Sequence, residues 1–205
     1  MANRSDLRGY VRNYLYEASA DLFADAKINQ ALDEAMTELN VDGVYTQAIF
    51  ENTLVVNQLD YALPTGTVEV ESIEMNVGTS DNPEWKTMHG WEVYAGAYWL
   101  SVRPATTNTV RLKVRKRFTL LTDDVTATDV PTDKIPILTC LASIKCYEML
   151  MGYFVDAKNW DSIAKPDSVD MTKVIAWIRE LNTKYQRMRM KFRETPKAQD
   201  INLVE

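Results

Sequence analysis

The spacing of apolar residues changes twice along this chain, and that change constrains the fold more than any other feature of the sequence. Apolar residues recur every three or four positions up to about residue 43, every second position from about 44 to 119, and every three or four positions again after Pro136. A helix presents one face with a period of 3.6 residues, and a strand with a period of two. The sequence therefore predicts two helices, a sheet and two further helices, which is an α+β fold.

The flanking helices each supply a complete amphipathic face, so they can pack on one another without the sheet. We expect a four-helix bundle-like core formed by residues 1–43 and 120–193, an inserted antiparallel β subdomain at 44–119, and an extended C-terminal arm. The tail of that arm, 194–205, has no periodicity and is expected to become ordered only on a partner. With 205 residues, the chain is long enough for one core with an insertion.

The first two helices form a predicted helical hairpin. Ser5 is the expected cap of the first helix, which is predicted to end near Ala18. The second helix is predicted to follow Asp25 as its N-cap and to stop at Asp42-Gly43. Its apolar stripe comprises Ile28, Leu32, Ala35, Met36 and Leu39.

The region with a period of two predicts several strands and two hairpins. One hairpin is expected to turn near Glu51-Asn52, and a closing one pairs "AYWLSVRP" with "NTVRLKVRKRF". In "TVEVESIEMNV" the apolar positions change face, which predicts a bulge near Ser72. Leu63, before the Pro64 corner, is expected to be buried. The aromatic residues of this region either fill a small β core, which we favour, or line a partner surface: Trp85, Trp91, Tyr94, Tyr98 and Trp99.

Apolar residues surround the third helix on nearly all sides, with Lys145 and Glu148 as exceptions. This pattern predicts burial from more than one direction, and a neighbouring subunit could supply one of them. Cys140 and Cys146 lie about 9 Å apart along the helix and point to different faces, so both are expected to be free, buried thiols. The apolar stripe of the long last helix runs from Met171 to Phe192.

The residue types needed for catalysis, cofactor binding or metal binding are not arranged in any pattern that predicts these activities. The single histidine, His89, has no nearby cysteine or histidine, and the sequence contains no phosphate-binding or nucleophile motif. The acidic residues of the linker lack the spacing of a calcium loop, so a solvated loop is favoured: Asp123, Asp124, Asp129 and Asp133. We expect no enzyme activity, no cofactor and no metal site.

Charge and hydropathy argue against two classes of partner, the membrane and nucleic acid that the protein would coat. No signal peptide and no apolar window long enough to span a bilayer are expected, so no membrane partner is predicted. The net charge of −6 argues against a protein that coats nucleic acid. Any basic surface must therefore be local.

Two local basic clusters carry the candidate binding residues. Four basic residues alternate along one strand and would contact DNA or another subunit, or form a charged edge that blocks aggregation: Arg111, Lys113, Arg115 and Arg117. In "KYQRMRMKFRE" basic and apolar residues mix at the end of the last helix. The helix dipole explains part of this second cluster, and a docking arm explains the rest.

The order of several motifs resembles the head-to-tail adaptor (connector) proteins of tailed bacteriophages. The motifs are a second helix "FADAKINQALDEAMTELN", a strand and Leu-Pro corner in "LDYALPTGTVEVESIEMN", "LSVRP" before "VRLKVRKRF", and "LLTDDVTATDVPTDKIPILTCLASIKCYEML", an acidic linker with a Val-Pro corner leading into a helix. They cover about residues 5 to 155. Val130 replaces the usual Leu before Pro131, which is a small change of volume.

This resemblance implies a structural virion protein of the neck, synthesised in the cytoplasm of the bacterial host. Its implied partners are the portal protein, neck or tail proteins below it, further copies of itself in a dodecameric ring, and double-stranded DNA that passes without sequence recognition. The residues expected to bind the portal lie in the C-terminal region: Arg187, Met188, Arg189, Lys191, Phe192, Arg193, Ile201 and Leu203. The alternative is a nucleic-acid-binding module that uses the basic strand and the basic last helix.

Overall fold

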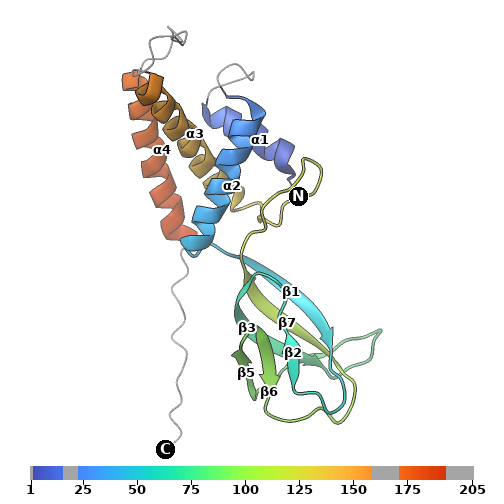
Figure 1. Ribbon diagram of the computed structural model, residues 1–205. Helices are drawn as coiled ribbons and strands as arrows, with labels where there is room; N and C mark the ends of the chain where they lie inside the picture. Colours follow the sequence, from blue (N-terminus) through green and yellow to red (C-terminus); the bar gives the residue numbers. More distant parts are fainter. Residues whose placement is uncertain (1, 16–22, 158–170, 193–205) are drawn as a thin grey trace, which may run out of the picture. The chain divides into compact units, whose positions relative to one another are not determined.

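The computed structural model describes residues 2–15, 23–157 and 171–192 (Figure 1). The chain divides into two compact units: the first combines the chain up to Val44 with the chain from Leu120 onward, and the second is Tyr45–Thr119. The described residues include four helices and two antiparallel sheets, so the predicted α+β class is confirmed. The four-helix bundle-like arrangement stays a prediction.

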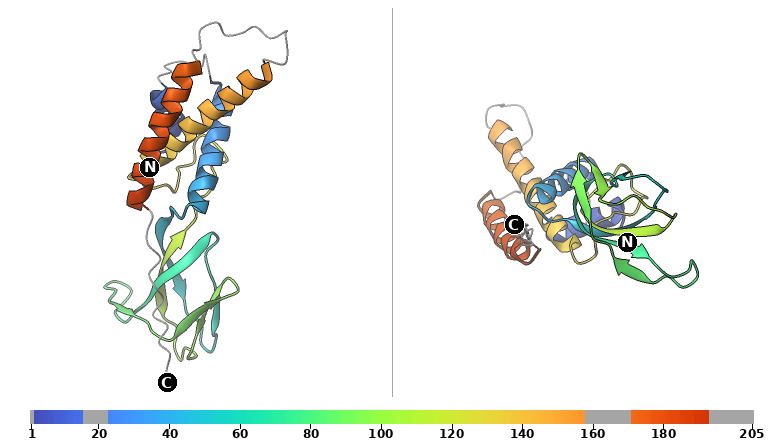
Figure 2. Two further views of the ribbon diagram at one scale, coloured as in Figure 1. Left: turned by 90° about the vertical axis from the view of Figure 1, so that its left-hand side faces the viewer. Right: turned by 90° about the horizontal axis from the view of Figure 1, so that it is seen from below.

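The first unit contains the helices α1 (Arg4–Leu15), α2 (Asp25–Val41), α3 (Ile135–Ala157) and α4 (Met171–Phe192). Helix α3 packs against each of the other three (Figure 2). The expected stripe of α2 is buried in full, from Ile28 to Leu39. Helix α4 buries Val174, Leu181 and Tyr185 on one side. Apolar faces of α1, α2 and α4 therefore meet around α3.

Helix α3 is buried from several directions, as its sequence predicts, and the described helices of its own unit supply them. Cys140 and Cys146 are free and buried, and burial raises the pKa of the Cys140 thiol to about 11. By length and composition Ile135–Gly152 could cross a bilayer, contrary to the expectation from the sequence. In this structure 61% of that window is buried, as in the central helix of a soluble protein.

The helix ends correct two predictions. Asn3, not Ser5, caps α1: the Asp6 amide donates to Asn3 Oδ1 at 2.9 Å, and the Asn3 amide donates to Asp6 Oδ2 at 3.0 Å. This reciprocal pair is a capping box, in which the acidic residue at the third helical position completes the cap. Asp25 is the first residue of α2, after Ala24, rather than its N-cap.

The predicted stop of α2 at Asp42-Gly43 is confirmed. Gly43 has φ of +79°, which glycine adopts without steric cost. The Val44 amide then donates to the Leu39 carbonyl at 3.0 Å and closes the helix end.

The second unit contains two antiparallel sheets. The larger has the order β1-β7-β3-β4, and the smaller β2-β6-β5. The bounds are β1 (Thr46–Thr53), β2 (Asp60–Ala62), β3 (Thr67–Asn76), β4 (Trp85–Thr87), β5 (Trp91–Tyr94), β6 (Ala97–Leu100) and β7 (Thr109–Lys116).

Both predicted hairpins are wrong, although the strands themselves are present. Strand β1 continues through Glu51 and Asn52 to Thr53 and pairs with β7 along its whole length. Strands β6 and β7 lie in different sheets. Strand β7 is an interior strand, so its charges do not protect a sheet edge. Alternation of apolar residues identifies strands, but pairing of neighbours along the chain is only a tendency.

The two sheets share one core, and Val110, Leu112 and Val114 of β7 face into it. The expected bulge is confirmed, because the register of β3 against β7 shifts between Val70 and Ser72. The shift allows the residues on both sides of Ser72 to reach the core despite their opposite phase.

The core also corrects the expectation for Leu63, which is half-buried and packs at the margin of the cluster. Tyr61 is the buried anchor: its ring stacks on Tyr98 at 5.1 Å, and its hydroxyl accepts from the Val55 amide at 3.0 Å. The favoured core role therefore holds for Tyr98, whereas Tyr94 and Trp99 are exposed.

Candidate partner-binding surface

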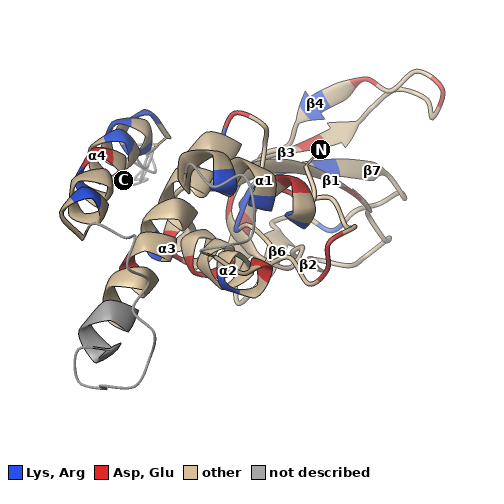
Figure 3. Cartoon of the chain, turned by 90° about the horizontal axis from the view of Figure 1, so that it is seen from above, with Lys and Arg blue, Asp and Glu red and all other residues tan. Residues whose placement is uncertain are grey.

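The last two turns of α4 carry the described part of the predicted docking region, and Figure 3 shows the Lys and Arg residues of this helix in blue. Arg187 and Lys191 are exposed, Met188 and Phe192 are half-buried, and Met190 is 79% exposed. Basic residues are favourable in a last helical turn because the free carbonyls there carry partial negative charge. Arg193, Ile201 and Leu203 lie outside the described residues.

Arg189 differs from its neighbours because it has a partner inside the unit. Its Nη2 lies 2.7 Å from Asp42 Oδ1, and the Tyr185 hydroxyl donates to Asp42 Oδ2 at 2.6 Å. Burial and the bond to Asp42 raise the pKa of the Tyr185 hydroxyl above its usual range. These three residues, which we call the Asp42 clamp, join the last turns of α4 to the end of α2.

The clamp separates the predicted docking residues into two groups. Arg189 holds the helix that carries the others, whereas Arg187 and Lys191 leave their charges exposed. From the sequence, Asp42 is predicted only to be part of the end of the second helix. Its role as an ion-pair partner, 147 positions from Arg189, has no local signature.

The basic row on β7 is largely neutralised by its neighbour β3. Arg111 and Lys113 both donate to Glu74, with Lys113 Nζ 2.6 Å from Oε1. Arg115 pairs with Glu69 at 3.0 Å and Glu71 at 2.9 Å. Three basic side chains thus face three carboxylates. Hydrogen bonds from Lys113 and then Arg111 lower the pKa of Glu74.

Arg117, the fourth residue of the predicted row, lies beyond the end of β7 and is exposed. It is therefore separate from the neutralised part of the row. The structure brings Arg111, Lys113 and Arg115 together on one face of the sheet, but not as a free basic surface.

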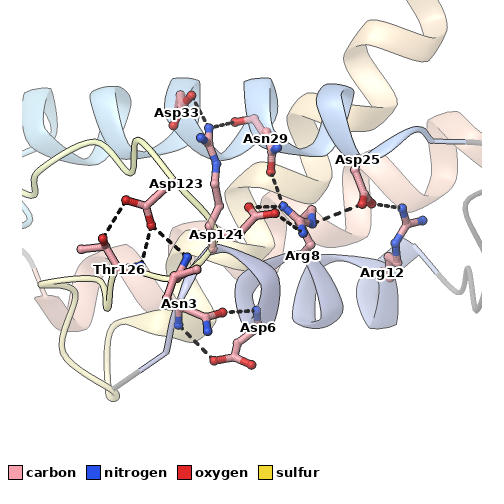
Figure 4. Close-up of polar contacts among 12 residues, drawn as sticks. Asn3, Asp6, Arg8, Arg12, Asp25, Asn29, Asp33, Asp123, Asp124 and Thr126 are labelled. Carbon is pink, nitrogen blue, oxygen red and sulfur yellow. Dashed lines mark hydrogen bonds and ion pairs between the residues drawn. The ribbon is translucent and has the colours of Figure 1, made fainter.

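A second ion-pair system, absent from the sequence predictions, lies along α1 (Figure 4). Arg4 Nη2 contacts Asp33 of α2 at 2.6 Å, and Arg12 Nη2 contacts Asp25 at 2.7 Å. These arginines lie eight positions apart with Arg8 between them, so all three share one helix face. The spacing of four would have indicated this arginine face.

Arg8, in the middle of this face, holds the acidic linker. Its Nη1 and Nη2 contact the two carboxylate oxygens of Asp124 at 2.5 and 2.9 Å, a bidentate geometry. Hydrogen bonding to Asp124 raises the pKa of Arg8. Figure 4 shows Asp124 turned toward α1 from the linker. The ion pair between Arg8 and Asp124 therefore attaches the linker to helix α1.

The other acidic residue of this loop has a local role. Asp123 Oδ1 accepts from the amides of Val125 at 2.8 Å and Thr126 at 2.6 Å, and these bonds lower its pKa. Within the described part of the chain, no group of three His, Cys, Asp or Glu side chains is placed to hold a metal ion. His89 is exposed.

Residues 2–198 match the model of one protein family, described as SU10 adaptor protein. No curated protein matches the chain. Among solved structures, a similar chain belongs to an assembly described as "Neck of empty GTA particle computed with C6 symmetry"; it is 14% identical, with 87% of each chain covered and a TM-score of 0.32.

Proposed function

Because the chain belongs to the SU10 adaptor protein family and is a structural head-to-tail adaptor, we propose that its copies form a dodecameric ring beneath the portal of a phage particle. The single observation that supports this proposal is the family match over nearly the whole chain. The ring extends the DNA channel and offers a surface to neck or tail proteins. The protein performs no chemistry.

Portal docking is assigned to the end of α4 and the segment that follows it. The exposed residues Arg187 and Lys191 supply charge, and Met188 and Phe192 supply flexible apolar contact. Arg189 is left out of this assignment because Asp42 already holds it. Arg193, Ile201 and Leu203, outside the described residues, complete the proposed arm.

Passage of DNA without retention is consistent with the charge of the chain. The net charge is −6, and the basic residues at positions 111, 113 and 115 face carboxylates. A channel lining of like charge repels the phosphate backbone, so DNA slides instead of binding. For the same reason, no observation favours the alternative of a nucleic-acid-binding module over the adaptor.

Mixing the purified protein with isolated portal rings tests the proposal. Electron microscopy is expected to show portal rings decorated by a second ring, and DNA binding by the free protein is expected to be weak. The adaptor would be refuted if the portal rings stayed undecorated and the free protein formed discrete complexes with DNA that dissociate as the salt concentration rises. That result would support the nucleic-acid-binding module.

Two variants test the docking assignment separately from ring assembly. Deleting residues 194–205 is expected to leave a folded protein that no longer joins the portal. Arg187→Glu is expected to weaken joining in a salt-dependent way, because its charge is exposed. Arg179→Glu, on the same helix and also exposed, is the matched control. If the truncated protein still joins portal rings with unchanged affinity, the docking surface must instead lie on the helical unit.

A further inference from the structure

The outer face of the small sheet carries an exposed tryptophan between two carboxylates. In the pairing register, Trp99 of β6 lies directly opposite Asp60 of β2 on one side and Glu92 of β5 on the other. Because β6 is the middle strand, Trp99 is flanked on both sides. The three residues are exposed, and Trp99 is 42% exposed. We call Asp60, Trp99 and Glu92 the acidic–aromatic row; Figure 1 shows β2, β5 and β6.

The inward positions of the same strands explain why this row must face outward. Tyr98 and Leu100, on either side of Trp99 in β6, are buried in the shared core. Successive side chains of a strand point to opposite faces, so Trp99 cannot join them without a slip of register. Exposure of this large apolar side chain therefore follows from the fold.

The row has the composition of an arginine site that the larger sheet already contains. There, the Arg111 guanidinium carbon lies 4.5 Å from the centre of the Trp85 ring, and its Nε donates to Glu74. An indole and a carboxylate thus hold one guanidinium. In the acidic–aromatic row the indole and two carboxylates are present, and no cation from the described residues pairs with either Asp60 or Glu92.

The strand spacing allows one cation above Trp99 to interact with both carboxylates. Neighbouring strands lie about 4.8 Å apart, so each carboxylate-bearing strand is one strand spacing from Trp99. A guanidinium stacked on the indole is attracted by the ring face and by both negative charges. The adjacent outward row contains Ala62 and Ala97, whose small side chains leave room for an approaching chain beside the exposed ring of Tyr94.

We propose that the acidic–aromatic row docks an arginine side chain presented by a partner protein. Charge complementarity is the argument: two unpaired carboxylates next to an exposed indole fit a cationic segment and disfavour an acidic one. The surface lies in the second unit, so this inference is separate from docking through α4 and stands or falls without it.

The experiment titrates the full-length protein, labelled with fluorotryptophan, with L-argininamide. The Trp99 fluorine signal is identified by its loss in Trp99→Phe. A saturable shift of that signal is expected with argininamide, and none with glycinamide at the same ionic strength, which tests for the guanidinium side chain. Asp60→Asn with Glu92→Gln is expected to weaken binding about tenfold, because it removes the charges and keeps the shape.

Asp81→Asn with Glu84→Gln neutralises two other exposed acids of the same unit and is the matched control, expected to leave binding unchanged. Absence of a saturable Trp99 shift would overturn the proposal. So would equal affinity in the Asp60/Glu92 variant. A shift with maltotriose but not with argininamide would also overturn it and identify a saccharide platform instead.

Discussion

Removing the carboxylate of the Asp42 clamp tests the assignment of Arg189 to the helical unit. In Asp42→Ala, the Tyr185 hydroxyl and Arg189 both lose their partner, and the Arg189 Nε already lies buried without a hydrogen bond. The backbone bond from residue 42 to the Glu38 carbonyl remains, so the end of α2 is kept.

The magnitude follows from two hydrogen bonds to a charged group, each worth about 1.5–3 kcal/mol. The side chains of Arg189 and Asp42 are 27% and 17% exposed, so water can partly replace the lost contacts. We therefore expect Asp42→Ala to lower the free energy of unfolding by about 3 kcal/mol. Tyr185→Phe, which removes one bond and keeps the ring, should lower it by about 1 kcal/mol.

Urea unfolding followed by helical circular dichroism measures these changes in the first unit, and tryptophan fluorescence gives a second probe because the two units can unfold separately. A double-mutant cycle with Arg189→Ala should give a coupling energy of about 1–2 kcal/mol. Asp81→Ala, an exposed loop residue, is the control and should have little effect. A cost below about 0.5 kcal/mol for Asp42→Ala would refute the clamp and return Arg189 to the docking surface.

Three further predictions concern the second unit. Tyr61→Phe should destabilise the protein by about 0.5–1.5 kcal/mol in urea unfolding, because the Val55 amide loses its acceptor. Leu63→Ala should cost less than the roughly 2–5 kcal/mol of a full core truncation, because Leu63 is only half-buried, and a cost within that range would show that Leu63 is a core residue. The lowered pKa of Glu74 adds stability that is present above the unfolded pKa and is lost as pH falls through the lower folded pKa. Glu74→Gln should therefore lose less stability than the unmodified protein as pH falls below about 5. The same dependence of unfolding free energy on pH in both proteins would exclude this role of Glu74. Replacing residues 46–118 by a short linker should leave helical circular dichroism and a cooperative melt, whereas complete unfolding would place the sheet in the helical core.

Local periodicity was sufficient to predict the element types of this protein and several of their details. The apolar stripe of α2, its stop at Gly43 and the length of α4 all depend on residues within a few turns of one another. The bulge of β3 could be predicted for the same reason, since the apolar residues change face near Ser72 within ten consecutive residues. The order of the motifs also indicated the adaptor family, which the match over residues 2–198 supports.

The tertiary structure decided which elements meet and which charges remain free. Whether β1 pairs with β2 or β7, and whether Arg111 meets a phosphate or Glu74, depends on contacts between residues far apart in the sequence. Arg187 and Arg189 are two positions apart and chemically identical, yet one is exposed and the other is held by Asp42. The reason is geometric: a rotation of about 200° along a helix turns one arginine to solvent and its neighbour toward α2, and no local pattern records what lies there.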